Sequence, residues 1–302
     1  GYWKKYADFE KKKGTAEKCM MVFERGIKAI PLSADLWIHY LNHVKVEYAT
    51  QPEFIRVQYE RAVEACGREW RSDKLWDHFV KWEIENNAFA AALKIYDRII
   101  RNPTQGLSHQ FDMFRDFVKA NNPKDMLEVD DFLTLRREII QSTKDVKGDA
   151  AKEEKKDDEK KDDEKKEDDE ADKETKSAEE TPAEEDKGDS AADVPAEGEK
   201  APGEDDDGKM TDEENIAMRE KIIFDRRKIF KETEEKVQTR WKFEDNIKRP
   251  YFHMKPLERG QLKNWNDYLE FAIEESKKEA DKNCGIDEDM VEILFERCLI
   301  AC

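Results

Sequence analysis

The sequence predicts an all-α fold, an α-α superhelix of stacked helical hairpins interrupted by a long acidic insertion. Three observations carry this prediction. Aromatic residues recur at a spacing of three, a motif of aromatic, acid and arginine follows about 20 residues later, and no alternating strand pattern exceeds a few residues in the 302-residue chain. Recurrence of paired helical patterns every 34 to 39 residues is typical of helix-pair solenoids.

The first motif places aromatic residues at positions i, i+3 and i+6, which share one stripe of a helix. We expect these side chains to pack between neighbouring hairpins and assign them no ligand. The groups are Trp3, Tyr6 and Phe9; Trp37 and Tyr40; Trp76, Phe79 and Trp82; Phe111, Phe114 and Phe117; and Trp265, Tyr268 and Phe271.

The second motif marks the second helix of each hairpin. Its copies are Phe23-Glu24-Arg25, Tyr59-Glu60-Arg61, Tyr96-Asp97-Arg98 and Phe295-Glu296-Arg297. Because the acid and the arginine recur at one place in the hairpin, they favour a repeated ion pair or hydrogen bond that joins the hairpin's two helices. Binding of a partner by these charges is the alternative.

Three segments follow from these patterns. Residues 1–143 form about four hairpins, residues 144–210 a linker rich in Lys, Asp and Glu, and residues 211–302 about two further hairpins. Pro31 closes the first hairpin, and Thr211 with Glu214 offers a capping box where order resumes. Residues 216–247 are either one long helix or a hairpin without an obvious turn.

The linker accounts for most of the formal charge of −18. Residues 151–210 hold 27 acids against 12 lysines and no aromatic, Leu or Ile, so we expect disorder. The remaining chain is nearly neutral. Ser177, Thr181 and Ser190 each precede an acid by three residues, which makes them candidate sites for acid-directed kinases, whereas a plain solvated spacer is the simpler interpretation.

Several classes of protein are disfavoured. No apolar run is long enough to span a bilayer, so we expect a soluble protein without membrane contact. His39, His43 and Glu47 share a helix face, but no further ligands complete a metal site, and no catalytic motif is present. We therefore predict no enzyme activity, cofactor or metal, and five reduced cysteines that pack as small apolar residues. The absent initiator Met and the end at Cys302 suggest a fragment of a longer protein.

Two stretches carry a resemblance to a known family. Trp3, Tyr6, Phe9 and Glu10 on one helix, with Phe23-Glu24-Arg25 on the next and Pro31 after it, resemble the half-a-TPR (HAT) repeat. The stretches around Ala29–Tyr40 and Ile247–Leu257 are similar to HAT proteins of the U1 small nuclear ribonucleoprotein (snRNP). The resemblance implies a nuclear, non-catalytic scaffold that contacts U1 snRNP proteins and other splicing factors during 5′ splice-site recognition. It also implies that the full-length protein dimerises through repeats absent here, and that RNA contact is indirect.

Two alternatives remain open. The first is a HAT scaffold of another RNA-processing machine, such as a 3′-end cleavage complex. The second is direct RNA binding through the basic groups at Arg136-Arg137, Arg226-Arg227-Lys228 and Lys248-Arg249, each of which is flanked by acids.

Overall fold

The computed structural model describes residues 1–142, 211–252, 254–278 and 287–302. These residues form helices, turns and loops and contain no strand, which confirms the all-α prediction. Most of the acidic linker, with Ser177, Thr181 and Ser190, lies outside the described residues, so its predicted disorder and phosphorylation stay predictions.

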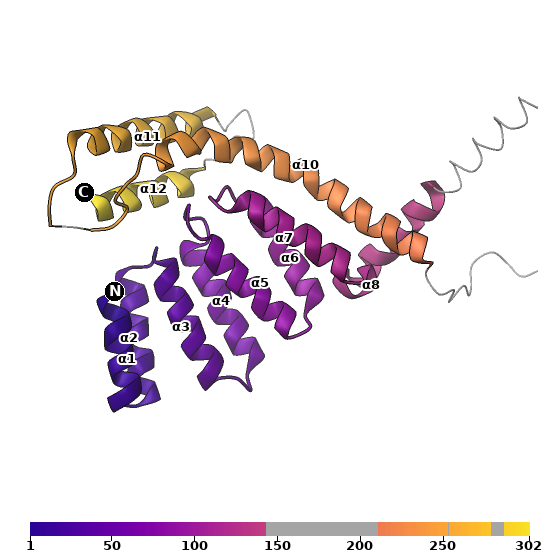
Figure 1. Cartoon of the computed structure of the whole chain (residues 1–302), viewed down its shortest axis with the longest axis horizontal. Coiled ribbons are helices and arrows are strands. Elements are labelled where there is room, and N and C mark those ends of the chain that lie inside the picture. The colour runs from indigo at the N-terminus through magenta and orange to yellow at the C-terminus, as the bar shows by residue number, and fades with distance from the viewer. Residues whose placement is uncertain (143–210, 253, 279–286) are drawn as a thin grey trace, which may run out of the picture. The chain divides into compact units, whose positions relative to one another are not determined.

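Three complete hairpins open the chain. They are α1 (Tyr2–Lys13) with α2 (Ala16–Ala29), α3 (Ala34–Glu47) with α4 (Pro52–Cys66), and α5 (Asp73–Glu85) with α6 (Phe89–Ile100). Consecutive hairpins lie side by side in chain order (Figure 1). Each first helix therefore packs against its own second helix and against its neighbours.

Local chemistry sets the helix boundaries. The Thr15 and Ser33 hydroxyls accept hydrogen bonds from the backbone N–H groups of Lys18 and Leu36, and so cap α2 and α3. Asn87 adopts a left-handed φ of 57°, which allows the short turn between α5 and α6. The proline of the first inter-hairpin loop, Pro31, accepts a hydrogen bond from Trp37 Nε1 at 2.8 Å, so this loop is tied to the helix that follows it.

The fourth hairpin has a different form. Its first helix, α7 (Leu107–Ala120), is followed by the short α8 (Pro123–Met126) and by helical residues 129–142. The next labelled element, α10 (Asp212–Glu244), is one continuous 33-residue helix, which decides between the two alternatives for this region. The Thr211 hydroxyl accepts a hydrogen bond from Glu214 N at 3.2 Å, which confirms that half of the predicted capping box.

The chain ends in a further hairpin, α11 (Arg259–Lys278) and α12 (Glu288–Ala301). Its core contains Ile247, Trp265, Tyr268, Met290 and Leu294. A larger core runs through the N-terminal hairpins and includes Ile222 from α10. These α10 contacts connect the segments on either side of the acidic linker.

The chain divides into two compact units. One comprises Gly1–Arg136 together with Asn215–Cys302, so both blocks of hairpins belong to it. The other comprises Arg137–Glu214, of which the structure describes residues 137–142 and 211–214.

Candidate interaction surface

Neighbouring hairpins are joined by a repeated aromatic contact, which we call the aromatic clasp. In each clasp, one aromatic ring from a second helix contacts two rings on the following first helix, at the second and third positions of the aromatic motif. Phe23 on α2, for example, has its ring centroid 6.1 Å from Tyr40 and 5.6 Å from His43 on α3.

The same geometry occurs three more times. The clasps are Tyr59 with Phe79 and Trp82 (4.7 and 5.2 Å), Tyr96 with Phe114 and Phe117 (5.6 and 5.3 Å), and Phe243 with Tyr268 and Phe271 (4.9 and 5.2 Å). Aromatic pairs at these separations stabilise by about 0.5–1.5 kcal/mol beyond the area they bury. The clasps therefore fix the spacing of successive hairpins and position the side chains on the surface of the stack.

A second repeated contact, the acid–arginine ladder, runs beside the clasps. The acid of one second helix pairs with an arginine on the second helix of the next hairpin. The long helix α10 takes the position of a second helix in two of these pairs. The rungs are Glu24–Arg61 at 3.1 Å, Glu60–Arg98 at 2.9 Å, Asp97–Arg226 at 2.6 Å and Glu244–Arg297 at 2.6 Å. The first two rungs are partly exposed to solvent, so each contributes at most about 1 kcal/mol.

Each motif arginine also lies over the leading tryptophan of its own hairpin. The guanidinium-to-ring distances are 5.8 Å for Arg25 and Trp3, 5.8 Å for Arg61 and Trp37, 5.2 Å for Arg98 and Trp76, and 5.8 Å for Arg297 and Trp265. These are cation–π distances. The arginine therefore links the two helices of a hairpin through the ring and links two hairpins through the ladder.

Glu244 is the most buried acid of the ladder. Arg297 donates to both of its carboxylate oxygens at 2.6 and 2.8 Å, and the Tyr268 hydroxyl donates to Oε1 at 2.9 Å. Burial alone would raise the pKa of Glu244, but the hydrogen bonds and charge of Arg297, with Arg240 and Tyr268, bring that pKa below its ordinary value. The carboxylate is thus held ionised inside the core.

Arg297 also reaches the N-terminal block. Its Nε lies 3.1 Å from Glu69 Oε1, and burial raises the pKa of the Glu69 carboxyl, an effect that the charge of Arg297 partly opposes. Arg68 donates to both carboxylate oxygens of Asp287 at 2.6 and 2.7 Å. Ion pairs between residues more than 200 positions apart therefore hold α12 against the loop that precedes α5.

The long helix α10 takes the place of a second helix in the stack. Its Arg226 completes the rung with Asp97, and its Phe230 stacks on Phe111 of α7 with ring centroids 4.2 Å apart. Near its C-terminal end, α10 contributes Phe243 and Glu244, which contact Tyr268 and Arg297 of the last hairpin. One helix thus continues both the clasp and the ladder across the position of the acidic linker.

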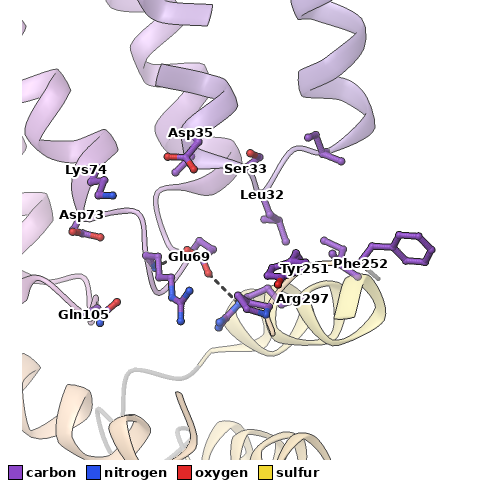
Figure 2. Close-up of a pocket in the computed structure, with 15 residues that line it drawn as sticks. Leu32, Ser33, Asp35, Glu69, Asp73, Lys74, Gln105, Tyr251, Phe252 and Arg297 are labelled. Atoms are coloured by element: carbon purple, nitrogen blue, oxygen red, sulfur yellow. Dashed lines mark hydrogen bonds and ion pairs between the residues drawn. The ribbon is translucent and has the colours of Figure 1, made fainter. Parts of the chain in front are cut away.

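A groove of about 570 Å³ lies where the inter-hairpin loops meet the connector before α11. Figure 2 shows Glu69 and Arg297 joined within it, Tyr251 near Arg297, and Phe252 directed away. Its lining combines apolar side chains with both signs of charge: Ile30, Leu32, Ser33, Ala34, Asp35, Glu69, Arg71, Asp73, Lys74, Gln105, Pro250, Tyr251, Phe252, Arg297 and Ile300. Such a mixed lining suits a peptide better than a polyanion.

The structure corrects the prediction that every aromatic of the first motif is buried, because Tyr6 is 42% exposed and Phe9 is 57% exposed. In the second motif, Phe295 is 41% exposed. The reason is that the clasp needs a partner helix, and none of the described helices covers Tyr6 and Phe9 or receives Phe295. Their counterparts inside the stack, such as Phe114 and Tyr59, are fully buried.

The predicted role of the acid–arginine motif is also wrong in one respect. The ion pairs are intramolecular, but they join second helices of successive hairpins and not the two helices of one hairpin. The motif's acid and arginine are adjacent in sequence and point to different neighbours, so each motif contributes to two rungs. Among the described residues, Arg25 and Glu296 form no rung, because no described helix presents the complementary charge to them.

Three contributors were missed by the sequence analysis. Arg226 follows Phe224-Asp225, which is a copy of the second motif without the final aliphatic residue, and Glu244 follows Phe243 in a copy without the arginine. The third is Glu83, a fully buried acid next to Trp82 that accepts hydrogen bonds from Arg56 at 2.7 and 2.9 Å. A search for the aromatic–acid pair alone finds all three places, Phe224-Asp225 before Arg226, Phe243-Glu244 and Trp82-Glu83.

Of the residues considered for metal binding, His43 packs in the core between hairpins. His43 is buried against Phe23, and burial lowers its pKa. Within residues 1–142, 211–252, 254–278 and 287–302, no group of three His, Cys, Asp or Glu side chains is placed to hold a metal ion.

Of the cysteines, Cys19 and Cys66 pack as small apolar residues, whereas Cys302 is exposed. None of the described helices has an apolar stretch long enough to cross a membrane.

The clasps, the ladder and the absence of strands in the described parts define a helical-repeat protein built from HAT-type hairpins. Two models of one family match the chain: the PRP39 N-terminal HAT repeat over residues 1–116 and the PRP39 C-terminal HAT repeat over residues 238–302. The chain belongs to this PRP39 family of HAT-repeat proteins.

Full-chain relatives agree with this assignment. The chain is 39% identical to pre-mRNA-processing factor 39 of Danio rerio over 311 residues, covering all of this chain and 34% of the relative. It is 39% identical to the Homo sapiens protein of that name, covering 38% of the relative, and 26% identical to the Schizosaccharomyces pombe one, covering 39%. The chain therefore spans little more than a third of the length of these curated relatives.

Proposed function

We propose that the protein is a non-catalytic scaffold in pre-mRNA splicing, which contacts proteins of the U1 snRNP during 5′ splice-site recognition. The observation that carries the proposal is the repeated clasp and ladder in a chain whose relatives are named pre-mRNA-processing factors. A stack of hairpins fixed in this way presents an extended, rigid surface for protein partners.

The charge distribution supports protein partners over RNA. The hairpin blocks are nearly neutral, and the strong negative charge lies in the linker. Two of the candidate basic groups are already engaged, because Arg226 pairs with Asp97 and Arg249 donates to the Lys255 carbonyl at 2.8 Å. Counter-ion release needs clustered free cations, so direct RNA binding is the weaker candidate.

The mixed groove supports the same proposal. Its lining includes two exposed apolar side chains of the connector, Tyr251 and Phe252. Exposed apolar groups beside a concave surface are typical of protein interaction sites. The proposal includes a nuclear location and dimerisation of the full-length protein through other repeats. It also includes the division of the chain into residues 1–143, 144–210 and 211–302.

Affinity purification from nuclear extract tests this function. The tagged chain is incubated with extract treated with ribonuclease, and the retained proteins are identified by mass spectrometry. We expect U1 snRNP proteins to remain bound. Recovery of 3′-end cleavage factors in their place would favour the alternative scaffold, and loss of all partners after ribonuclease would favour RNA binding.

A further inference from the structure

The turn between α1 and α2 is a cationic, exposed segment. Residues 11–18 contain four lysines and one glutamate, a formal charge of +3, and all eight residues are exposed to solvent. The corresponding turns of the next two hairpins, at residues 49–53 and 85–87, are exposed as well, although other hairpins lie on both sides of them. Exposure of the first turn therefore follows from its position within the hairpin.

Thr15 carries the hydroxyl group of this turn. It follows Lys12 and Lys13, which occupy the third and second positions before it. None of the other serines and threonines of the sequence has a lysine or an arginine at both of these positions. Protein kinases discriminate among substrates by such charge patterns, because opposite charges on the kinase pair with them.

The backbone around Thr15 is accessible to a second protein. Thr15 is the N-cap of α2 and has extended backbone angles (φ −119°, ψ 161°), and α1 ends at Lys13, two residues earlier. Because residues 11–18 are all exposed, opening the last turn of α1 uncovers no core side chain. The Thr15 hydroxyl can therefore reach the γ-phosphate of a nucleoside triphosphate in line while the hairpin stays folded.

We propose that Thr15 is a phosphorylation site for a kinase that selects two basic residues before the acceptor hydroxyl. Thr15 Oγ1 attacks the γ-phosphorus of ATP, the bond from that phosphorus to the β,γ-bridging oxygen breaks, and ADP leaves. The hydroxyl proton passes to the catalytic base of the kinase. The phosphate carries about −1.5 to −2 charges, so it lowers the formal charge of the turn from +3 to about +1.

The phosphate is placed where the fold accommodates an anion. Thr15 Oγ1 accepts a hydrogen bond from the backbone N–H of Lys18 at 3.3 Å, so a phosphate on this oxygen lies at the N-terminus of α2. The first N–H groups of a helix lack partners inside it, and the helix dipole favours negative charge at this end. Phosphorylation therefore keeps the hairpin folded and removes most of the positive charge from its turn.

The test incubates the whole chain with ATP and, in separate reactions, with two kinases that prefer basic residues before the acceptor, cyclic-AMP-dependent protein kinase and protein kinase C. Mass spectrometry quantifies the phosphate at each residue. We expect at least one of the two kinases to modify Thr15 about tenfold faster than Thr50, the effect of two ion pairs with the kinase. Thr50 is the matched control, because it is exposed in the turn of the second hairpin but follows Glu47 and Tyr48.

Substitutions separate recognition of the lysines from simple exposure. The double variant Lys12→Ala with Lys13→Ala should slow the modification of Thr15 about tenfold. Both side chains are exposed, so this variant should keep its thermal unfolding midpoint within about 2 °C. Thr15→Ser should retain the modification, and Thr15→Ala should abolish it at this position. A synthetic peptide of residues 9–20 reports whether the kinases recognise the same residues outside the fold.

Three results would overturn the proposal. Phosphorylation of the peptide but not of the whole chain would mean that the fold occludes Thr15. Absence of phosphate from Thr15 in both the chain and the peptide would mean that the lysine pair is not recognised. Equal rates at Thr15 and Thr50, or an unchanged rate in the double lysine variant, would mean that exposure alone decides which hydroxyl is modified.

Discussion

The buried carboxylate of Glu244 connects α10 to the last hairpin and, through Arg297, to Glu69 of the N-terminal block. The substitution Glu244→Gln keeps the side-chain shape but removes the charge that faces two arginines. Arg297 is 6% exposed and Arg240 is 2% exposed, so water cannot solvate either guanidinium in place of the lost carboxylate. Removing one partner of a buried pair costs about 3–5 kcal/mol.

We expect a loss near the lower end of this range, about 3 kcal/mol, because Glu69 remains beside Arg297 and the amide oxygen can still accept one hydrogen bond. The assay is urea unfolding followed by tryptophan fluorescence and by circular dichroism, with Glu60→Gln as the control. Glu60 forms the same ladder contact with Arg98 but at a half-exposed position.

Two results would contradict this role for Glu244. A loss below about 1 kcal/mol for Glu244→Gln would mean that the carboxylate is not held in a desolvated pair. Equal losses for Glu244→Gln and Glu60→Gln would mean that burial does not decide the strength of a rung.

Three further predictions follow from single sites. Trp76→Ala should cost about 3–5 kcal/mol, because the ring is 4% exposed and its Nε1 donates to the Gly67 carbonyl at 2.8 Å; an unchanged melting temperature would contradict this. Glu60→Gln should cost less than about 1 kcal/mol and even less in 0.5 M salt, as double-mutant cycles with Arg98→Gln would measure. Burial, with Lys45 and Lys81 nearby, lowers the pKa of His78 to about 4 from 6.5. The unfolded chain therefore binds this proton first, so stability is full above pH 6.5 and falls as the pH drops from 6.5 towards 4, and His78→Gln should flatten the measured pH dependence.

The sequence predicted the hairpins well because their signals are local. A stripe such as Trp76, Phe79 and Trp82 depends only on helical periodicity. The length of α10 was left open since its apolar positions are interrupted by charges, and only packing against α7 and α11 shows that it continues.

The contacts between hairpins could not be predicted in the same way. Whether Glu60 pairs within its own hairpin or with Arg98 of the next depends on the stacking geometry, which motif spacing does not contain. The exposure of Tyr6 and Phe9 has the same origin, because burial of these rings requires a neighbouring helix. The groove beside Tyr251 is formed by loops that are distant in sequence, and no single motif indicates it.

We propose that partners are bound by the helical hairpins and not by the acidic linker. The most direct measurement is a pull-down from nuclear extract that compares the natural chain with one in which residues 145–210 are replaced by a Gly-Ser linker of equal length. We expect both chains to retain the same U1 snRNP proteins in similar amounts. Loss of these proteins from the chain with the neutral linker would contradict it.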